Sequence, residues 1–119
     1  MVLSNNDGCV IARSNESKAL GIKMGVPVFQ VKHLIRQHNV HVFSSNFTLY
    51  GDLSKRVMST MRQEVKVMEV YSIDEAFMDF SGEGDPLSKG IALKKKVSQH
   101  TGIPISIGIA PTKTLCKVA

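Results

Sequence analysis

From residue 40 onward, strand-like and helix-like segments follow one another in the order β-α-β-β-α-β, and this order limits the fold more than any other feature. The expected strands are 40–44, 68–72, 76–80 and 104–109, the expected helices are 47–65 and 86–101, and a further helix opens at Thr112. This is the split βαβ, ferredoxin-like pattern, in which two helices cover one face of a sheet and leave the other face free. The sequence therefore predicts an α+β fold.

The two long helices have the clearest local signals. Apolar residues recur at every fourth position of the first helix, as expected for a core-facing stripe: Leu49, Leu53, Val57 and Met61. At the second helix, Asp85 is a favourable N-cap, Pro86 fits the first helical position and Gly102 fits the residue after the last turn.

The first 40 residues predict a separate small α+β lobe. The dipeptide Asp-Gly at positions 7–8 lies between apolar segments and predicts a hairpin turn, because glycine accepts a positive φ. Short helices are expected at 14–20 and 27–37. The first strand has room for only two apolar residues, so we expect its upstream part to lie outside this sequence. The expected lobes are residues 1–40 and 41–119.

Composition limits the class of protein and its partners. The 119 residues are 43% hydrophobic and 21% charged, which is ordinary for a folded domain or part of one. A net charge of +5 and a pI of about 9.4 favour a polyanionic partner as much as a chance surface composition. No apolar run approaches the roughly 20 residues of a membrane helix. Two cysteines far apart in sequence predict reduced thiols and a cytoplasmic protein.

Residues 72–77, Ser-Ile-Asp-Glu-Ala-Phe, carry the strongest chemical signal. Asp74 and Glu75 lie at a tight turn between two strands, where both side chains can point out of the end of a sheet. Clustered carboxylates are the hard oxygen ligands that Mg²⁺ requires, and two such ions can assist phosphoryl transfer. From spacing alone, a solvated acidic turn is the simpler interpretation.

The same segment resembles the second metal motif of the Y-family translesion DNA polymerases. Residues 9–27 (CVIARSNESKALGIKMGVP) resemble the fingers segment that touches the incoming triphosphate. Tyr50 and the helix after it resemble the palm helix that precedes the metal motif. Residues 108–119 (GIAPTKTLCKVA) resemble the palm strand and helix whose lysine contacts the phosphates. The opening LSNNDGCVIAR is closest to the UmuC type, the catalytic subunit of bacterial DNA polymerase V. The resemblance covers essentially the whole chain.

The resemblance implies a role for several palm residues. Asp74 corresponds to a metal ligand, and Glu75 to the adjacent carboxylate at the primer-terminus metal. Lys113 corresponds to the lysine that reaches the triphosphate, and Tyr50 to a residue that supports the nucleotide pocket.

Two fingers positions depart from the pattern of many family members. A Tyr and an Arg bind the triphosphate there, whereas this chain has Asn15 and Lys18. Lys18 keeps the positive charge but lacks the guanidinium fork, and Asn15 lacks the phenol.

The resemblance also implies an activity and partners. These are two-Mg²⁺ nucleotidyl transfer from a dNTP to a primer 3′ end, during translesion synthesis in the SOS response. The implied partners are primer–template DNA, a processed UmuD dimer and a RecA filament, with no membrane. The family's strand with the first metal Asp would precede Val2, and its thumb and little-finger domain would follow Ala119. We therefore expect a fragment of fingers and palm that is inactive alone. The alternative is a non-catalytic module that binds nucleic acid or protein through a palm-like sheet.

Three other signals favour ordinary explanations. Residues 108–114 follow a strand and open a helix, but they lack the second glycine that a P-loop needs. Three histidines at positions 33, 38 and 41 have no cysteine or carboxylate at ligand spacing, which favours solvated side chains. The lysines at 94–96 favour a solvated helix face over a DNA contact.

Overall fold

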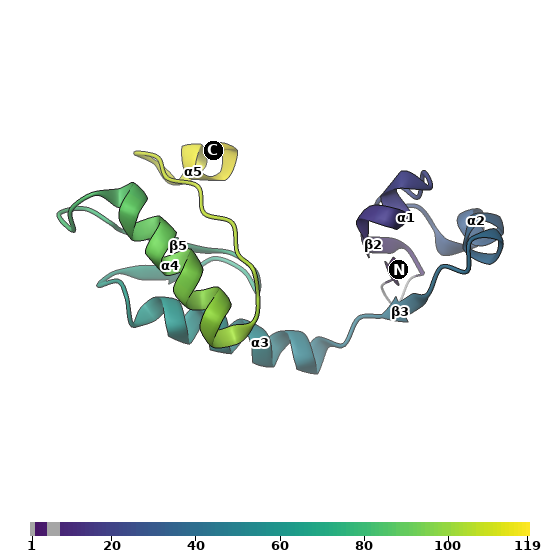
Figure 1. The fold of residues 1–119 in the computed structure, drawn as a ribbon, viewed down its shortest axis with the longest axis horizontal. Coiled ribbons are helices and arrows are strands. Elements are labelled where there is room, and N and C mark those ends of the chain that lie inside the picture. The colour runs from purple at the N-terminus through teal and green to yellow at the C-terminus, as the bar shows by residue number, and fades with distance from the viewer. Residues whose placement is uncertain (1, 5–7) are drawn as a thin grey trace. The chain divides into compact units, whose positions relative to one another are not determined.

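The computed structural model describes residues 2–4 and 8–119. The chain forms two compact units, Met1–Phe47 and Thr48–Ala119. Both units combine helices with a small sheet, so the α+β class predicted from the sequence is confirmed (Figure 1). Among the described helices, none is both long and apolar enough to cross a membrane.

The first unit is built on a three-stranded sheet with the order β2-β1-β3. Strands β1 (Val2–Ser4) and β2 (Val10–Arg13) are antiparallel, and β3 (Val42–Ser44) runs parallel to β1. The two strands of the predicted hairpin are therefore present. Asp7 of its turn lies outside the described residues, while Gly8 has the positive φ of 74° that its position in the sequence suggests.

Short helices complete the first unit. Ser14 caps α1 (Asn15–Ala19) by accepting a hydrogen bond from the backbone N–H of Ser17. The single helix predicted at 27–37 is instead a 3₁₀ turn, η1 (Val28–Val31), followed by α2 (Lys32–Gln37). Among the residues whose burial the structure describes, the core of this unit contains Val10, Ile22 and Val31.

The second unit packs two long helices against a hairpin. Helix α3 (Phe47–Arg62) and helix α4 (Pro86–Thr101) pack against one face of strands β4 (Met68–Val70) and β5 (Ala76–Met78), which are antiparallel (Figure 1). Helix α5 (Lys113–Val118) ends the chain. The buried core is contributed by both long helices: Val57, Met58, Met61, Leu93 and Val97.

The predicted stripe on α3 is only half buried. Val57 and Met61 belong to the core, but Leu49 is 47% exposed. The buried residues of α3 all lie in its C-terminal half.

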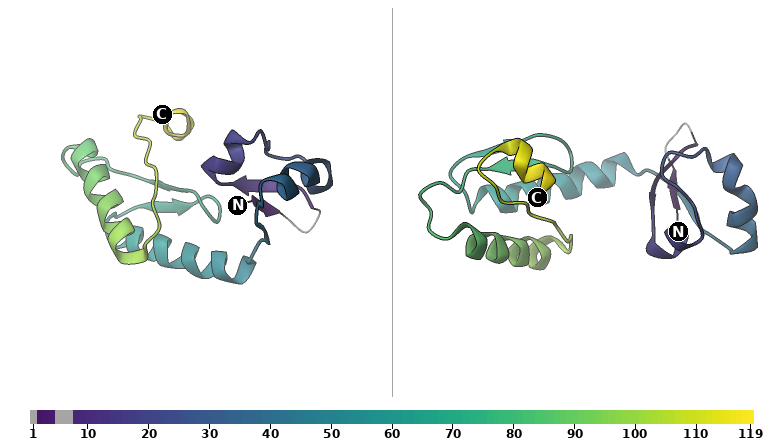
Figure 2. Two further views of the ribbon diagram at one scale, coloured as in Figure 1. Left: turned by 45° about the vertical axis from the view of Figure 1, so that its right-hand side comes forward. Right: turned by 90° about the horizontal axis from the view of Figure 1, so that it is seen from above.

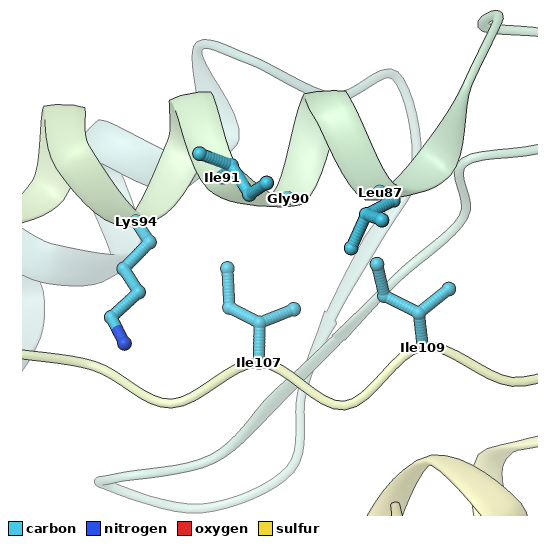
Figure 3. A pocket seen from close by; sticks show the side chains of 6 residues that line it. All are labelled: Leu87, Gly90, Ile91, Lys94, Ile107 and Ile109. Atoms are coloured by element: carbon cyan, nitrogen blue, oxygen red, sulfur yellow. The ribbon is translucent and has the colours of Figure 1, made fainter.

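The predicted strand at 104–109 is not a strand in the structure. Residues 103–110 run from the end of α4 to α5 without a strand partner among the described residues (Figure 2). A strand forms only where a neighbour supplies complementary backbone groups. Instead, Ile107 and Ile109 face α4, where Gly90 leaves room for them (Figure 3). Of the four strands predicted from residue 40 onward, only β4 and β5 pair with each other, because β3 pairs with β1 of the first unit.

The break between the two units falls after Phe47, whereas the sequence places the lobe boundary after residue 40. The difference arises because β3 is hydrogen-bonded to β1 and so belongs to the first sheet. The assignment of a fingers lobe and a palm lobe remains a prediction.

Candidate functional site

The β4–β5 hairpin has two different faces. Successive residues of a strand point to opposite sides, and the register pairs Glu69 with Phe77. One face contributes partly buried Met68 and Met78 to the core between α3 and α4. The other face bears Glu69, Phe77 and, beyond the end of β4, Tyr71. The hairpin thus presents a polar and aromatic surface on the side away from the core.

The turn that follows β4 is closed by short-range hydrogen bonds. The backbone N–H groups of Tyr71 and Ser72 both donate to the carbonyl of Glu75, each at 3.0 Å. The Ser54 hydroxyl of α3 donates to the carbonyl of Ile73 and ties the turn to that helix. The turn is therefore fixed both by its own backbone and by its helical neighbour.

The two predicted metal ligands lie in this turn. Asp74 and Glu75 are adjacent and both exposed. The Ser72 hydroxyl donates to Asp74 Oδ1 at 2.7 Å, and it accepts from the backbone N–H of Asp74 at 3.3 Å. Neither carboxylate is buried in the core, so both are accessible to a cation from solvent.

Helix α5 brings two lysines to the same face of the hairpin. Thr112 caps this helix by accepting from the backbone N–H of Leu115 at 3.3 Å. Lys113 forms an ion pair with Glu69, and its ammonium lies 5.3 Å from the centre of the Phe77 ring. Residues four positions apart share one face of a helix, so the next lysine of α5 points the same way.

That next lysine is Lys117, which contacts one of the predicted metal ligands. Its Nζ lies 3.2 Å from Oε1 and 3.4 Å from Oε2 of Glu75. The ammonium is also 4.8 Å from the centre of the Tyr71 ring. The Tyr71 and Phe77 rings meet edge to face, with centroids 5.5 Å apart. Carboxylates, aromatic rings and ammonium groups therefore alternate across this face.

The remaining predicted residues lie elsewhere. Tyr50 is in the first turn of α3 and is 38% exposed. Asn15 and Lys18 are exposed on α1, in the first unit. Because α1 and the hairpin belong to different units, the role at the triphosphate that the resemblance gives Lys18 remains a prediction.

Sequence reasoning missed Lys117, Ser72 and the pair formed by Glu69. Two signals could have pointed to Lys117 and Glu69. Lys113 and Lys117 have the i, i+4 spacing of one helix face. Glu69 has the same strand parity as Tyr71, so the two share a face of the hairpin.

The donor groups fit a magnesium ion that shares its coordination with substrate. Mg²⁺ usually takes one or two carboxylates from the protein and completes its six positions with water and phosphate oxygens. Asp74 and Glu75 supply such oxygens. Within residues 2–4 and 8–119, no group of three or more His, Cys, Asp or Glu could hold a metal ion. The described residues therefore suit a shared ion and do not form a closed metal site.

Comparison with known proteins identifies the family. The impB/mucB/samB family profile matches residues 1–119. ImpB of Salmonella typhimurium is 51% identical over the whole chain, and UmuC of Salmonella typhimurium strain LT2 is 48% identical over the whole chain. The chain spans 29% of the length of each of these relatives. Among solved structures, a Y-family DNA polymerase chimera matches 99% of this chain and 37% of its own, with a TM-score of 0.85 and 25% identity.

Proposed function

The chain belongs to the impB/mucB/samB family, and from this membership we propose that it is part of a DNA-templated DNA polymerase for translesion synthesis. One observation carries the proposal above all: two adjacent exposed carboxylates, Asp74 and Glu75, lie in the turn that joins β4 to β5, and Glu75 contacts Lys117 of α5. Relatives named UmuC and a similar Y-family DNA polymerase structure support the same class of reaction.

In the proposed reaction, the primer 3′ oxygen attacks the α-phosphorus of a bound dNTP, and pyrophosphate leaves. Such an enzyme works by positioning and charge neutralisation. Asp74 and Glu75 would bind Mg²⁺, which when bound supplies positive charge at the reacting phosphate oxygens. Asp74 and Glu75 suit this role because both are exposed and the turn that carries them is fixed by hydrogen bonds.

Cationic side chains would bind the triphosphate. Lys113 is assigned to this role, and it would have to leave Glu69 to reach a phosphate. Both side chains of this ion pair are more than half exposed, so breaking the pair costs at most about 1 kcal/mol of stability. Lys18 and Asn15 of the fingers lobe, 1–40, would approach from α1. Tyr50 of the palm lobe, 41–119, would support the nucleotide pocket.

The wider setting is proposed on family grounds. The partners are primer–template DNA and a dNTP, together with a processed UmuD dimer and a RecA filament. The setting is the cytoplasmic SOS response to DNA damage. The net charge of +5 is consistent with a polyanionic partner.

Primer extension by the full-length protein tests the proposal. The template should carry a lesion, and the variant should be Asp74→Ala, which removes a metal ligand. We expect extension to fall about 100-fold or more, because even indirect partners of metal ligands can cost that much. The matched control is Asp52→Ala, which removes a carboxylate paired with Arg56 on the surface of α3. Equal activity of the Asp74 variant and the control would refute the assignment.

The alternative is a non-catalytic module that binds nucleic acid or protein. Duplex binding by the full-length protein without any template-dependent extension would favour it. We further propose that the 119 residues expressed alone do not polymerise and bind Mg²⁺ weakly, because the described residues offer only two clustered carboxylates. Template-dependent extension by this polypeptide would contradict that expectation.

A further inference from the structure

The ammonium of Lys117 lies against both oxygens of a proposed metal ligand. Its Nζ is 3.2 Å from Glu75 Oε1 and 3.4 Å from Oε2, so it occupies the side of the carboxylate that a cation would use. The same nitrogen lies over the Tyr71 ring, 4.8 Å from its centre, and this contact also favours the ammonium at this place. In this arrangement the positive charge beside Glu75 is supplied by the protein itself.

We propose that Lys117 is a positioning residue that competes with the divalent cation for Glu75 and moves to a phosphate group when substrate binds. The inference rests on the proposed function, since it takes Glu75 as a metal ligand. A carboxylate can serve an ammonium or a metal ion at the same oxygens, but not both at full strength. Lys117 therefore lowers the affinity for a divalent cation until an anion draws its ammonium away.

The exchange is feasible because the ion pair is exposed. The side chains of Lys117 and Glu75 are 46% and 45% exposed, so solvent screens the attraction and the pair is weak. The triphosphate of a dNTP, or the row of phosphodiesters along a DNA strand, places more negative charge near the ammonium than one carboxylate does and attracts it more strongly. Phosphate binding then frees Glu75, and cation binding frees Lys117. By linkage, each event strengthens the other by the same factor.

The neighbouring pair on α5 does not compete in this way. Lys113 is paired with Glu69, which lies within β4 and not in the turn that holds Asp74 and Glu75. Both lysines come from one helix face, but only Lys117 touches a proposed metal ligand. The competition is therefore specific to Lys117.

The test measures Mn²⁺ binding to the full-length protein by electron paramagnetic resonance of the free ion, without phosphate and without turnover. Replacement of the ammonium in Lys117→Gln should raise Mn²⁺ affinity about two- to fivefold, the range expected for an exposed ion pair. Lys117→Arg keeps the charge and should bind Mn²⁺ as the wild type does. Lys117→Met keeps the apolar part of the side chain. It replaces Lys117→Gln in the test if the melting temperature of the Gln variant is too low for the measurement. The charge-matched control is Lys96→Gln, which breaks an ion pair with Glu64 and should not alter Mn²⁺ affinity.

The second part of the test adds phosphate from each of two sources. One arm uses a primer–template duplex with a blocked 3′ end, and the other uses a dNTP. Chelation of Mn²⁺ by the added phosphate in solution is the same for the wild type and for Lys117→Gln, so it cancels in the ratio of their Mn²⁺ affinities. The higher Mn²⁺ affinity of Lys117→Gln relative to the wild type should disappear in the arm whose phosphate binds the Lys117 ammonium. If the higher affinity persists in both arms, the transfer of the ammonium is wrong.

The outcomes separate this inference from the proposed function. Equal or weaker Mn²⁺ affinity of Lys117→Gln, together with a loss of affinity in Glu75→Gln, overturns the role of Lys117 and leaves the metal site intact. Unchanged affinity in Glu75→Gln overturns the metal site as well. Higher affinity in Lys117→Gln but not in Lys96→Gln supports the competition.

Discussion

At the scale of single residues, Ser72 determines how Asp74 is held. Its hydroxyl donates to the carboxylate at 2.7 Å and accepts from the backbone N–H of the same residue at 3.3 Å. Serine often makes such local hydrogen bonds in turns, where the backbone has no helix or sheet partner. One side chain therefore fixes both the backbone and the carboxylate direction of a proposed metal ligand.

Replacement of that hydroxyl should weaken cation binding more than folding. For Ser72→Ala in the full-length protein, we expect Mn²⁺ affinity to fall about threefold, while the free energy of unfolding changes by less than about 1 kcal/mol. Isothermal titration and urea unfolding measure the two quantities. Ser59→Ala, at an exposed position on α3, is the control. An unchanged Mn²⁺ affinity would show that Asp74 does not need this hydrogen bond.

At the scale of elements, α4 begins at a carboxylate whose ionisation stabilises the helix. The hydrogen bond from the Ser88 hydroxyl, with those from the backbone N–H groups of Ser88 and Leu87, holds the pKa of Asp85 below its ordinary value. Because the pKa is lower in the folded state, the ionised cap stabilises α4 fully above the unfolded pKa. This contribution is lost as the pH falls through the folded pKa.

Acid unfolding measures the contribution of Asp85. Between about pH 5 and pH 2, the melting temperature of the wild type should fall more steeply than that of Asp85→Asn, which caps the helix without titrating. At neutral pH, Asp85→Ala should melt about 5 °C lower, because it removes the cap altogether. Parallel curves for wild type and Asp85→Asn would contradict the assignment of the pH dependence to this residue.

Helix α5 depends on a close approach at Gly108. A Cβ at this position would lie 2.2 Å from the carbonyl oxygen of Cys116, which is closer than any real contact. Gly108→Ala should therefore push α5 away from the segment before it and destabilise the unit by about 1–3 kcal/mol. Cys116 reports the change, since its thiol is half-buried and lies 3.5 Å from the carbonyl of Ala110.

The measurement is the rate of thiol modification in a Cys9→Ser background, where Cys116 is the remaining cysteine. We expect faster modification of Cys116 in Gly108→Ala than in the parent protein. Gly82→Ala is the control for glycine replacement, because a Cβ there has no neighbour within 4 Å and only the backbone strain of an alanine at a φ of 72° is added. Equal rates in Gly108→Ala and the parent would mean that α5 accommodates the extra carbon without moving.

Local signals predict the helices of this chain better than its strands. The cap at Asp85 and the stop at Gly102 bound α4 as expected, because capping depends on residues within one turn. The segment 104–109 alternates like a strand, but strand formation needs a distant partner that local sequence does not specify. The turn with Asp74 and Glu75 could be found from its motif. The contact of Lys117 with Glu75 could not, because it joins residues 42 positions apart.

At the scale of the whole molecule, the described residues form two separate hydrophobic cores. Val10, Ile22 and Val31 form the core of the first unit, and five residues of α3 and α4 form that of the second. Strand β3 belongs with the first core through its pairing with β1, although the expected lobe boundary falls before it. Two cores without shared buried residues should open separately, as local unfolding units do in other proteins.

Hydrogen exchange in two core variants tests this independence. Ile22, which is 1% exposed, and Leu93, which is 3% exposed, are the matched pair, and replacement of either by alanine should cost about 2–5 kcal/mol in its own unit. Ile22→Ala should speed exchange in β2 and also in β3, because β3 is held by the first sheet, while α4 keeps its protection. Leu93→Ala should do the reverse. If β3 instead follows α4, the lobe boundary lies before residue 42, as the sequence alone predicts. Equal loss of protection throughout the chain in either variant would show one cooperative unit in place of two.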